Sequence, residues 1–66
     1  MQIILNGNPT EVPDGIAMDD LIKRLELTGQ RLAVEVNEEL VPRSRFGEHC
    51  LTPSDRVEII HAVGGG

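Results

Sequence analysis

The first hydrophobic segment of the chain is followed by a turn signal and by a second, shorter segment. Residues 1–5 are apolar with one polar break, and Asn6-Gly7 supplies the positive φ values of a tight hairpin turn. Residues 10–12 can then return antiparallel to the first segment. This stretch predicts a β-hairpin, and Pro13-Asp14-Gly15 interrupts regular structure after it.

A helical period replaces the strand pattern from Met18 onward. Apolar residues follow at spacings i, i+3, i+4 and i+7 as far as Leu25, and Gly29 supplies a stop signal. These positions predict an amphipathic helix with one apolar face. Its start is weakly specified, because Ala17 stands where a Ser, Thr or Asp cap is expected.

Alternation with a period of two returns after the helix. Residues 32–36 place three large apolar side chains on one side and Ala33 and Glu35 on the other, which indicates a half-buried strand. Residues 40–41 form a short returning strand, and Pro42 ends it because proline cannot donate to a ladder.

The last third of the chain contains an irregular segment and one more strand. Residues 43–51 predict a single short helical turn anchored by Phe46. In residues 56–63 one set of side chains points inward and the other outward. The inward set is Val57, Ile59, His61 and Val63, and the outward set is Glu58, Ile60 and Ala62.

The element order is therefore ββαββ, which predicts an α+β fold. The first and last strands are expected to lie parallel side by side in a mixed sheet, with one main helix packed on one face. This is the β-grasp, or ubiquitin-like, arrangement. We expect residues 1–63 to form the domain and residues 64–66 to form a flexible glycine tail.

Composition limits the partners of this domain. The chain has 66 residues, a net charge of −5, one Phe and no Trp or Tyr. Such acidity repels nucleic acid and anionic membranes, and stacking on bases needs aromatic residues, so we expect neither partner. A protein with a basic surface is favoured. A single cysteine, Cys50, forms no internal disulfide, which is typical of a cytoplasmic protein.

Other polar residues lack the partners that chemistry requires. His49-Cys50 has no second cysteine at metal-ligand spacing, so we predict no metal site and no catalytic residue. Cys50 is expected to pack beneath its loop. His61 is expected at a strand end or in a partner contact. The sequence assigns no role to His49, Cys50 or His61.

Three glycines, Gly64, Gly65 and Gly66, follow the last predicted strand. Glycine has the largest entropic cost of ordering and adds no packing, so stability does not account for them. An enzyme that draws a carboxyl group through a narrow channel needs a tail without Cβ atoms. The alternative interpretation is a frayed terminus.

Two further motifs accompany the three terminal glycines. One is Asn37 with Val41-Pro42-Arg43 and Phe46; the other, more specific, is residues 55–60, Asp-Arg-Val-Glu-Ile-Ile, leading to Val63 and the three glycines. With the length and element order, they resemble the ThiS family of ubiquitin-like sulfur carriers over essentially the whole chain. Two residues depart from that pattern: Ala17, where a hydroxyl cap is frequent, and Ser54, where glycine is common.

The resemblance implies a protein cosubstrate rather than an enzyme. Gly66 would be adenylated by an E1-like enzyme of the ThiF type and converted to a thiocarboxylate with sulfur from a persulfide protein. A thiazole synthase of the ThiG type would accept this sulfur to form the thiamine thiazole. ATP and Mg²⁺ would be used by the adenylating partner, and the carrier would bind no cofactor. The identity of the enzyme and sulfur donor, the loading state and the oligomeric state are left open.

Ordering the tail in a partner's channel requires a docking surface elsewhere. On the predicted sheet Ile4 and Ile60 face away from the helix, and we expect them to form an exposed apolar pair. The predicted partner-binding surface comprises Ile4, Ile60, Ala33, Ala62, Glu35 and Glu58.

Two alternatives share the fold. A MoaD-like carrier for molybdopterin synthesis would act through the same kind of tail, although such proteins are usually longer and richer in aromatic residues. A ubiquitin-like modifier or interaction module would end in a peptide or isopeptide bond instead of a thioacid.

Overall fold

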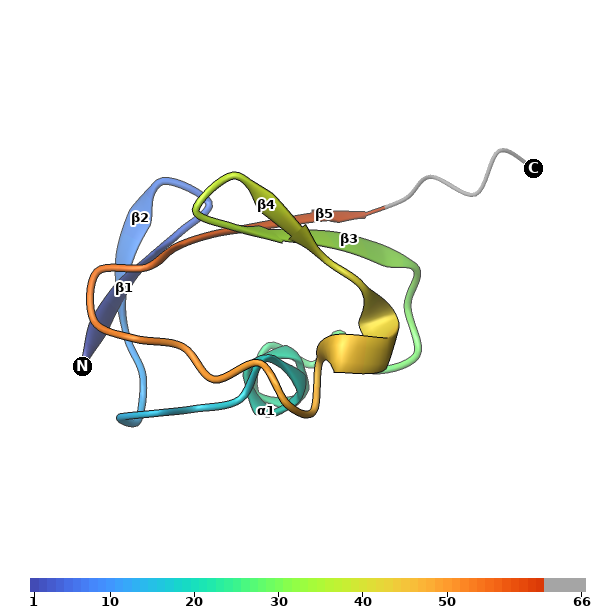
Figure 1. Ribbon diagram of the computed structural model, residues 1–66, viewed down its shortest axis with the longest axis horizontal. Helices are drawn as coiled ribbons and strands as arrows, with labels where there is room; N and C mark the ends of the chain where they lie inside the picture. The colour runs from blue at the N-terminus through green and yellow to red at the C-terminus, as the bar shows by residue number, and fades with distance from the viewer. Residues whose placement is uncertain (62–66) are drawn as a thin grey trace.

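The computed structural model describes residues 1–61, which form one mixed sheet crossed on one face by a helix (Figure 1). The predicted fold class is confirmed, and the elements follow in the predicted succession of hairpin, helix, strand pair, short turn and last strand; these are five strands, ββαβββ, one more than the order ββαββ counts. The strands are β1 (Gln2–Leu5), β2 (Asn8–Glu11), β3 (Leu32–Val36), β4 (Glu39–Val41) and β5 (Arg56–His61). The helix is α1 (Met18–Arg24), and the short turn is a 3₁₀ helix, η1 (Arg43–Arg45).

The strands lie side by side in the order β2-β1-β5-β3-β4. β1 and β5 are parallel, with Ile4 opposite Arg56 and Leu5 opposite Val57, whereas the other neighbouring pairs are antiparallel. The first and last strands are thus neighbours at the centre of the sheet, as predicted. This arrangement places β5, the last described element, in the middle of the sheet.

Both hairpins turn through two consecutive residues in the left-handed region. Asn6 and Gly7 have φ values of 49° and 84°, and Asn37 and Glu38 have values of 52° and 69°. Positive φ at both central positions gives the backbone twist that matches two antiparallel strands. Asn6-Gly7 is a recognisable signal for such a turn, whereas Glu38 adopts a conformation that its side chain disfavours.

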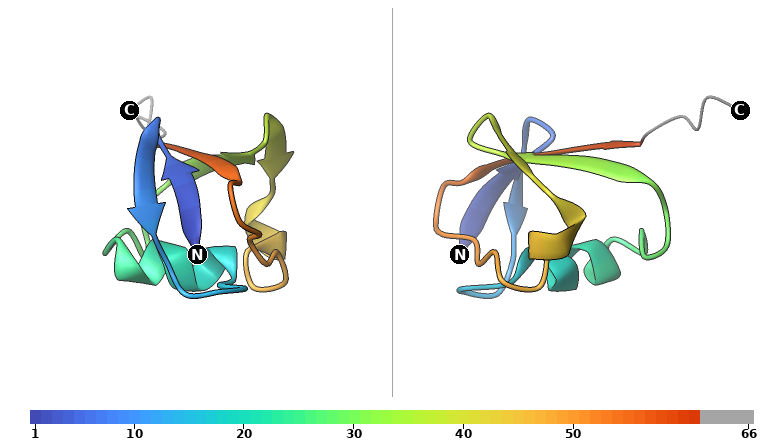
Figure 2. Two further views of the ribbon diagram at one scale, coloured as in Figure 1. Left: turned by 90° about the vertical axis from the view of Figure 1, so that its left-hand side faces the viewer. Right: turned by 45° about the vertical axis from the view of Figure 1, so that its right-hand side comes forward.

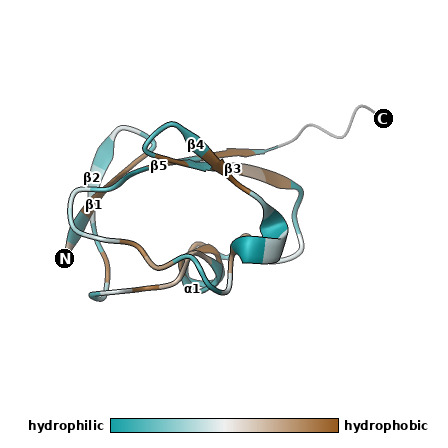
Figure 3. Ribbon diagram, in the orientation of Figure 1, coloured by the Kyte–Doolittle hydropathy of each residue, from teal (hydrophilic) through white to brown (hydrophobic). Residues whose placement is uncertain are grey.

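The hydrophobic core fills the space between the sheet and α1 (Figures 2 and 3). The strands contribute their inward residues, the helix contributes its apolar face, and the segment after η1 closes the side. The fully buried side chains are Ile3, Met18, Leu21, Val34, Leu51 and Val57. Phe46, the one aromatic residue, is also buried beside η1, as the sequence predicts.

Backbone carbonyls from another segment replace the missing cap of α1. Ala17 is extended and forms no side-chain cap, as expected from its chemistry. The amide of Met18 donates to the carbonyl of His49 at 2.8 Å, and the amide of Asp19 donates to that of Phe46 at 2.9 Å. Two amides of the first turn that lack an intrahelical partner are thereby satisfied. The helix start is therefore specified by tertiary contacts.

The expected burial of Cys50 is wrong. Cys50 forms an isolated bridge with Ala17 and its thiol is exposed, while the next residue, Leu51, is fully buried. Because successive residues of an extended segment point to opposite sides, burial of Leu51 turns Cys50 outward.

Several element boundaries differ by one or two residues from those predicted. α1 ends at Arg24, β2 covers residues 8–11 instead of 10–12, and β4 begins at Glu39 instead of Leu40. Of the strand predicted over residues 56–63, β5 covers 56–61, and Ala62 and Val63 lie outside the described residues.

Candidate functional site

Strand alternation directs one set of side chains to the face of the sheet opposite α1. Ile60 lies on this outer face with 51% of its surface exposed, so its predicted outward orientation is confirmed. Ala33 on β3 is directly opposite Ile60. The inward neighbours Val57 and Ile59 are buried in the core, also as predicted. An apolar surface is thus available near the end of β5.

Ile4 and Ile60 do not form the predicted exposed pair. Ile4 is partly buried, and the parallel register places it opposite Arg56, four residues before Ile60. At a strand rise of about 3.3 Å per residue, this offset corresponds to roughly 13 Å. The two residues share a face, but the register between β1 and β5 separates them.

Leu40 is a surface residue that the sequence analysis missed. It is 67% exposed and lies on β4 directly opposite Glu35. Its outward direction follows from burial of the next residue, Val41. The strand predicted over residues 40–41 was too short to show which of its two side chains faced the core. Pro42, which ends this strand, was the local signal that could have been used to place it.

Acidic residues border this apolar surface. Glu35 on β3 and Glu58 on β5 are directly opposite each other in the antiparallel register. Like charges at such cross-strand positions are destabilising. We call Ile60, Ala33, Leu40, Glu35 and Glu58 the outer-face patch.

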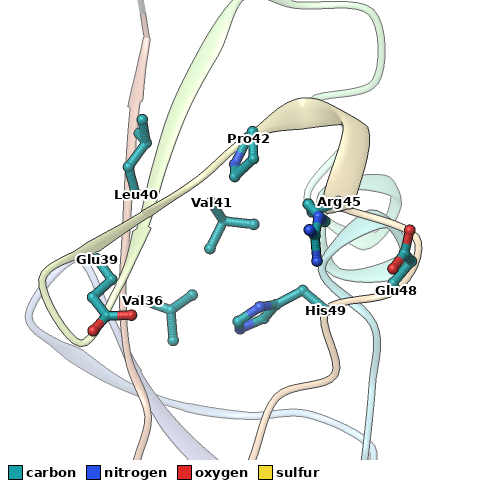
Figure 4. Close-up of a pocket in the computed structure, with 8 residues that line it drawn as sticks. All are labelled: Val36, Glu39, Leu40, Val41, Pro42, Arg45, Glu48 and His49. Carbon is teal, nitrogen blue, oxygen red and sulfur yellow. The ribbon is translucent and has the colours of Figure 1, made fainter.

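A shallow groove of about 370 Å³ lies between β4 and the segment after η1 (Figure 4). Val36, Val41 and His49 surround its floor, and Arg45 and Glu48 stand at its side. The lining combines both charges with apolar groups. Among residues 1–61, no group of three or more His, Cys, Asp or Glu side chains is placed to hold a metal ion.

A hydrogen-bond network fixes the chain where β5 begins. The carboxylate of Asp55, a buried residue, accepts from the amide and hydroxyl of Thr52, each at 2.9 Å, and from the amide group of Asn37 at 3.0 Å. The Asn37 side chain also accepts from the amide of Arg56 at 2.9 Å. Burial by itself would raise the pKa of Asp55, but the hydrogen bonds from Thr52 and Asn37 lower it below its ordinary value.

Replacement of this carboxylate is expected to destabilise the fold. In Asp55→Asn an amide group faces donors that now bond a carboxylate, and we expect a loss of about 1.5–3 kcal/mol in the free energy of unfolding near pH 7. Because the folded pKa of Asp55 is depressed, its contribution is complete above the unfolded pKa and is lost as pH falls through the folded pKa.

Urea unfolding between pH 7 and pH 2 tests this prediction. The difference between wild type and Asp55→Asn should shrink in acid. Asp20→Asn removes the same charge from an exposed position on α1 and should change the stability by less than about 0.5 kcal/mol. A difference between wild type and Asp55→Asn that is independent of pH would contradict the assignment.

The remaining predicted site residues, Ala62, Gly64, Gly65 and Gly66, lie outside the described residues. β5 ends at His61, directly before them in the sequence. No helix among residues 1–61 is long and apolar enough to cross a membrane.

A five-stranded mixed sheet of this order, with one helix on one face, defines a β-grasp domain. The chain belongs to the ThiS family, whose model matches residues 3–66. The crystal structure of the thiamine biosynthesis protein ThiS from Geobacter metallireducens is 28% identical and superposes with a TM-score of 0.87, with all of both chains covered.

Two curated relatives show the same family in different contexts. The sulfur carrier protein ThiS of Bacillus subtilis is 35% identical over 63 residues, which cover 94% of this chain and 96% of the relative. A thiazole synthase of Magnetococcus marinus is 35% identical over 66 residues, which cover all of this chain but only 20% of that protein. The chain thus spans about a fifth of the length of that relative.

The family membership defines the class of activity. The chain is a ThiS-family sulfur carrier of thiamine biosynthesis and acts as a carrier protein rather than an enzyme. The family model that matches is that of ThiS, the first of the families considered from the sequence.

Proposed function

We propose that Gly66 is the group on which this carrier is loaded with sulfur. A ThiF-type enzyme adenylates its carboxylate, a persulfide protein supplies sulfur, and the resulting thiocarboxylate delivers that sulfur to a thiazole synthase. The observation that carries this proposal is the family match, which extends through all three terminal glycines to residue 66.

The chemistry explains why the carrier needs a partner enzyme. An α-carboxylate has a pKa of about 3.3–3.7, so it is ionised at neutral pH and is a poor acyl electrophile. Its oxygen must attack the α-phosphate of ATP, with release of pyrophosphate, to form an acyl adenylate. Attack by the terminal sulfur of the persulfide on that carbonyl then releases AMP and leaves an acyl disulfide between carrier and donor. A thiol attacks the donor-side sulfur of this disulfide, which releases the thiocarboxylate and oxidises the two thiols to a disulfide. The first step brings two anions together and needs Mg²⁺ and cationic groups, which an acidic domain does not supply and its partner must.

Docking of the folded domain can compensate for ordering of the tail. Fixing three glycines costs on the order of 3–6 kcal/mol of backbone entropy, and a few hydrogen bonds at about 1 kcal/mol each offset only part of it. The outer-face patch offers apolar side chains in Ile60 and Leu40 and an acidic border that suits a basic partner. We propose that the adenylating enzyme binds this patch while the glycines enter its active site.

The identity of the sulfur acceptor is suggested by the domain composition of a relative. The Magnetococcus marinus thiazole synthase contains a segment that matches this entire chain. A carrier and an acceptor joined in one polypeptide are held at high effective concentration. We therefore propose thiazole synthase as the protein that accepts sulfur from this carrier.

Intact mass measurement tests the loading reaction. After incubation with a ThiF-type enzyme, MgATP, a persulfide donor and a thiol reductant, the carrier should exchange one oxygen for sulfur, and fragmentation should place the change on Gly66. Omission of ATP is the control. A covalent adduct between the carrier and a lysine, without any thioacid, would show a modifier instead.

A further inference from the structure

β5 is paired along its whole length on one edge but only at its beginning on the other. On the β3 side, the register extends from Val36 opposite Val57 to Leu32 opposite His61. On the other side, β1 pairs only with Arg56 and Val57. Figure 1 shows β5 continuing past the β1–β2 hairpin toward the end of the chain.

The side chain of Asn6 ends the β1–β5 ladder. The amide of Asn6 donates to the carbonyl of Val57 at 2.8 Å, and the Oδ1 atom of Asn6 accepts from the amide of Ile59 at 2.9 Å. Alternate residues of a strand direct their backbone groups to the same edge. The carbonyl of Ile59 and both backbone groups of His61 therefore lie on this edge, where no strand within residues 1–61 pairs with them. We call residues 58–61 on this side the open edge.

Apart from the charge of Glu58, the open edge lacks the features that discourage strand addition. The outermost strands of the sheet carry such features, with Pro9 within β2 and with Glu39 and Pro42 at the two ends of β4. Proline, charged residues and bulges are the usual protection of exposed strand edges. Residues 59–61 are Ile, Ile and His, which are typical of a strand that accepts another.

Resting on the proposed function, we infer that the open edge binds an extended segment of the adenylating enzyme, which adds to the sheet as a strand. The side chains beside it specify the chemistry of this segment. Glu58 and Ile60 alternate on the outer face, so a segment with Lys or Arg beside Glu58 and an apolar residue beside Ile60 fits best. The net charge of −5 favours the same basic partner.

Such an added strand has a specific consequence for loading. It would hold the backbone of residues 59–61, which end two residues before the glycine tail, and would restrict the positions from which the glycines start. Main-chain hydrogen bonds supply affinity in this mode of recognition, and the flanking side chains supply specificity. The register of the added strand would then set how far the tail reaches.

Two substitutions at one position separate the backbone from the side chain. His61→Pro removes the amide that faces the open edge, whereas the β3 ladder keeps its bonds because they involve the backbone of Ile60. His61→Ala removes the same imidazole and retains the amide. Each full-length carrier variant is incubated with a ThiF-type enzyme and MgATP. The release of pyrophosphate is the readout.

We expect the KM of the enzyme for His61→Pro to be about five- to tenfold higher than for His61→Ala, which corresponds to loss of one backbone hydrogen bond. Melting temperatures show whether both variants are folded. Equal KM values for two folded variants would overturn the inference, and thioacid formation by wild type would leave the proposed function standing.

Amide hydrogen exchange on the wild-type carrier tests the inference without any substitution. The amide of His61 should exchange fast in the free carrier and slowly in the complex with the enzyme, as an amide does when it enters a ladder. The amide of Glu58 serves as the internal control, since it faces β3 in both states. Unchanged exchange at His61 in the complex would overturn the inference.

Discussion

Deletion of Gly66 is expected to abolish thioacid formation on the carrier. The deletion leaves a carboxylate on Gly65, one residue short of the position at which a bound carrier presents its terminus. A displacement of about 3.5 Å removes an acyl group from the reach of an aligned phosphate, and such misplacement reduces rates by factors of at least about 100. The measurement is intact mass after reaction with a ThiF-type enzyme, MgATP, a persulfide donor and a thiol reductant.

The fold provides the control for this deletion. Among residues 1–61 every buried core residue lies between Ile3 and Ile59, and Gly66 has no side chain to lose from the core. The melting temperature of the variant should therefore equal that of wild type. Gly65→Val keeps the length of the tail and adds a β-branched side chain, and it should also prevent loading if the channel is narrow. Normal loading of the shortened carrier would refute the role of Gly66.

Ile60→Asp should weaken adenylation by raising the KM for the carrier. Ile60 is the most exposed apolar residue of β5, and Asp would replace apolar contact area with a charge beside two existing acids, Glu35 and Glu58. Loss of a buried aliphatic side chain at an interface, together with desolvation of a carboxylate, is expected to raise KM by about 10–100-fold. Steady-state pyrophosphate release at varied carrier concentration measures this effect.

Ile60→Val is the matched control, because it retains an apolar side chain suited to a strand. Its KM should stay within about threefold of wild type. Both variants should remain folded, since half of the Ile60 surface is exposed and its contribution to the core is small. An unchanged KM for Ile60→Asp would exclude the outer-face patch from the docking surface, while Leu40→Asp would show whether β4 contributes to it.

Local patterns in the sequence account for most of the fold. The spacing of Met18, Leu21 and Ile22 predicts the helix, and these are the residues that α1 buries. The dipeptide Asn6-Gly7 predicts the first hairpin because few residues reach positive φ at two adjacent positions. These signals depend only on residues that are close together in the chain, so they can be recognised from the sequence without the structure.

Parts of the candidate site depend on contacts between distant residues and could not be derived from those patterns. Alternation shows that Ile4 and Ile60 point away from the helix, but their separation follows from the register of β1 against β5. Alternation over two residues was also too short to place Leu40. Register is decided by the packing of both strands on a common core, which no local pattern contains.

The sequence by itself determined the class of fold and the inward and outward sides of β5, because each depends on residue type and spacing along one segment. Only the tertiary structure decided how α1 begins without a side-chain cap, since the carbonyls of His49 and Phe46 reach its first turn from another segment. Only the tertiary structure shows, in addition, that the pairing between β1 and β5 ends at Val57. The open edge is a property of two strands of unequal length, and it exists only once they are paired.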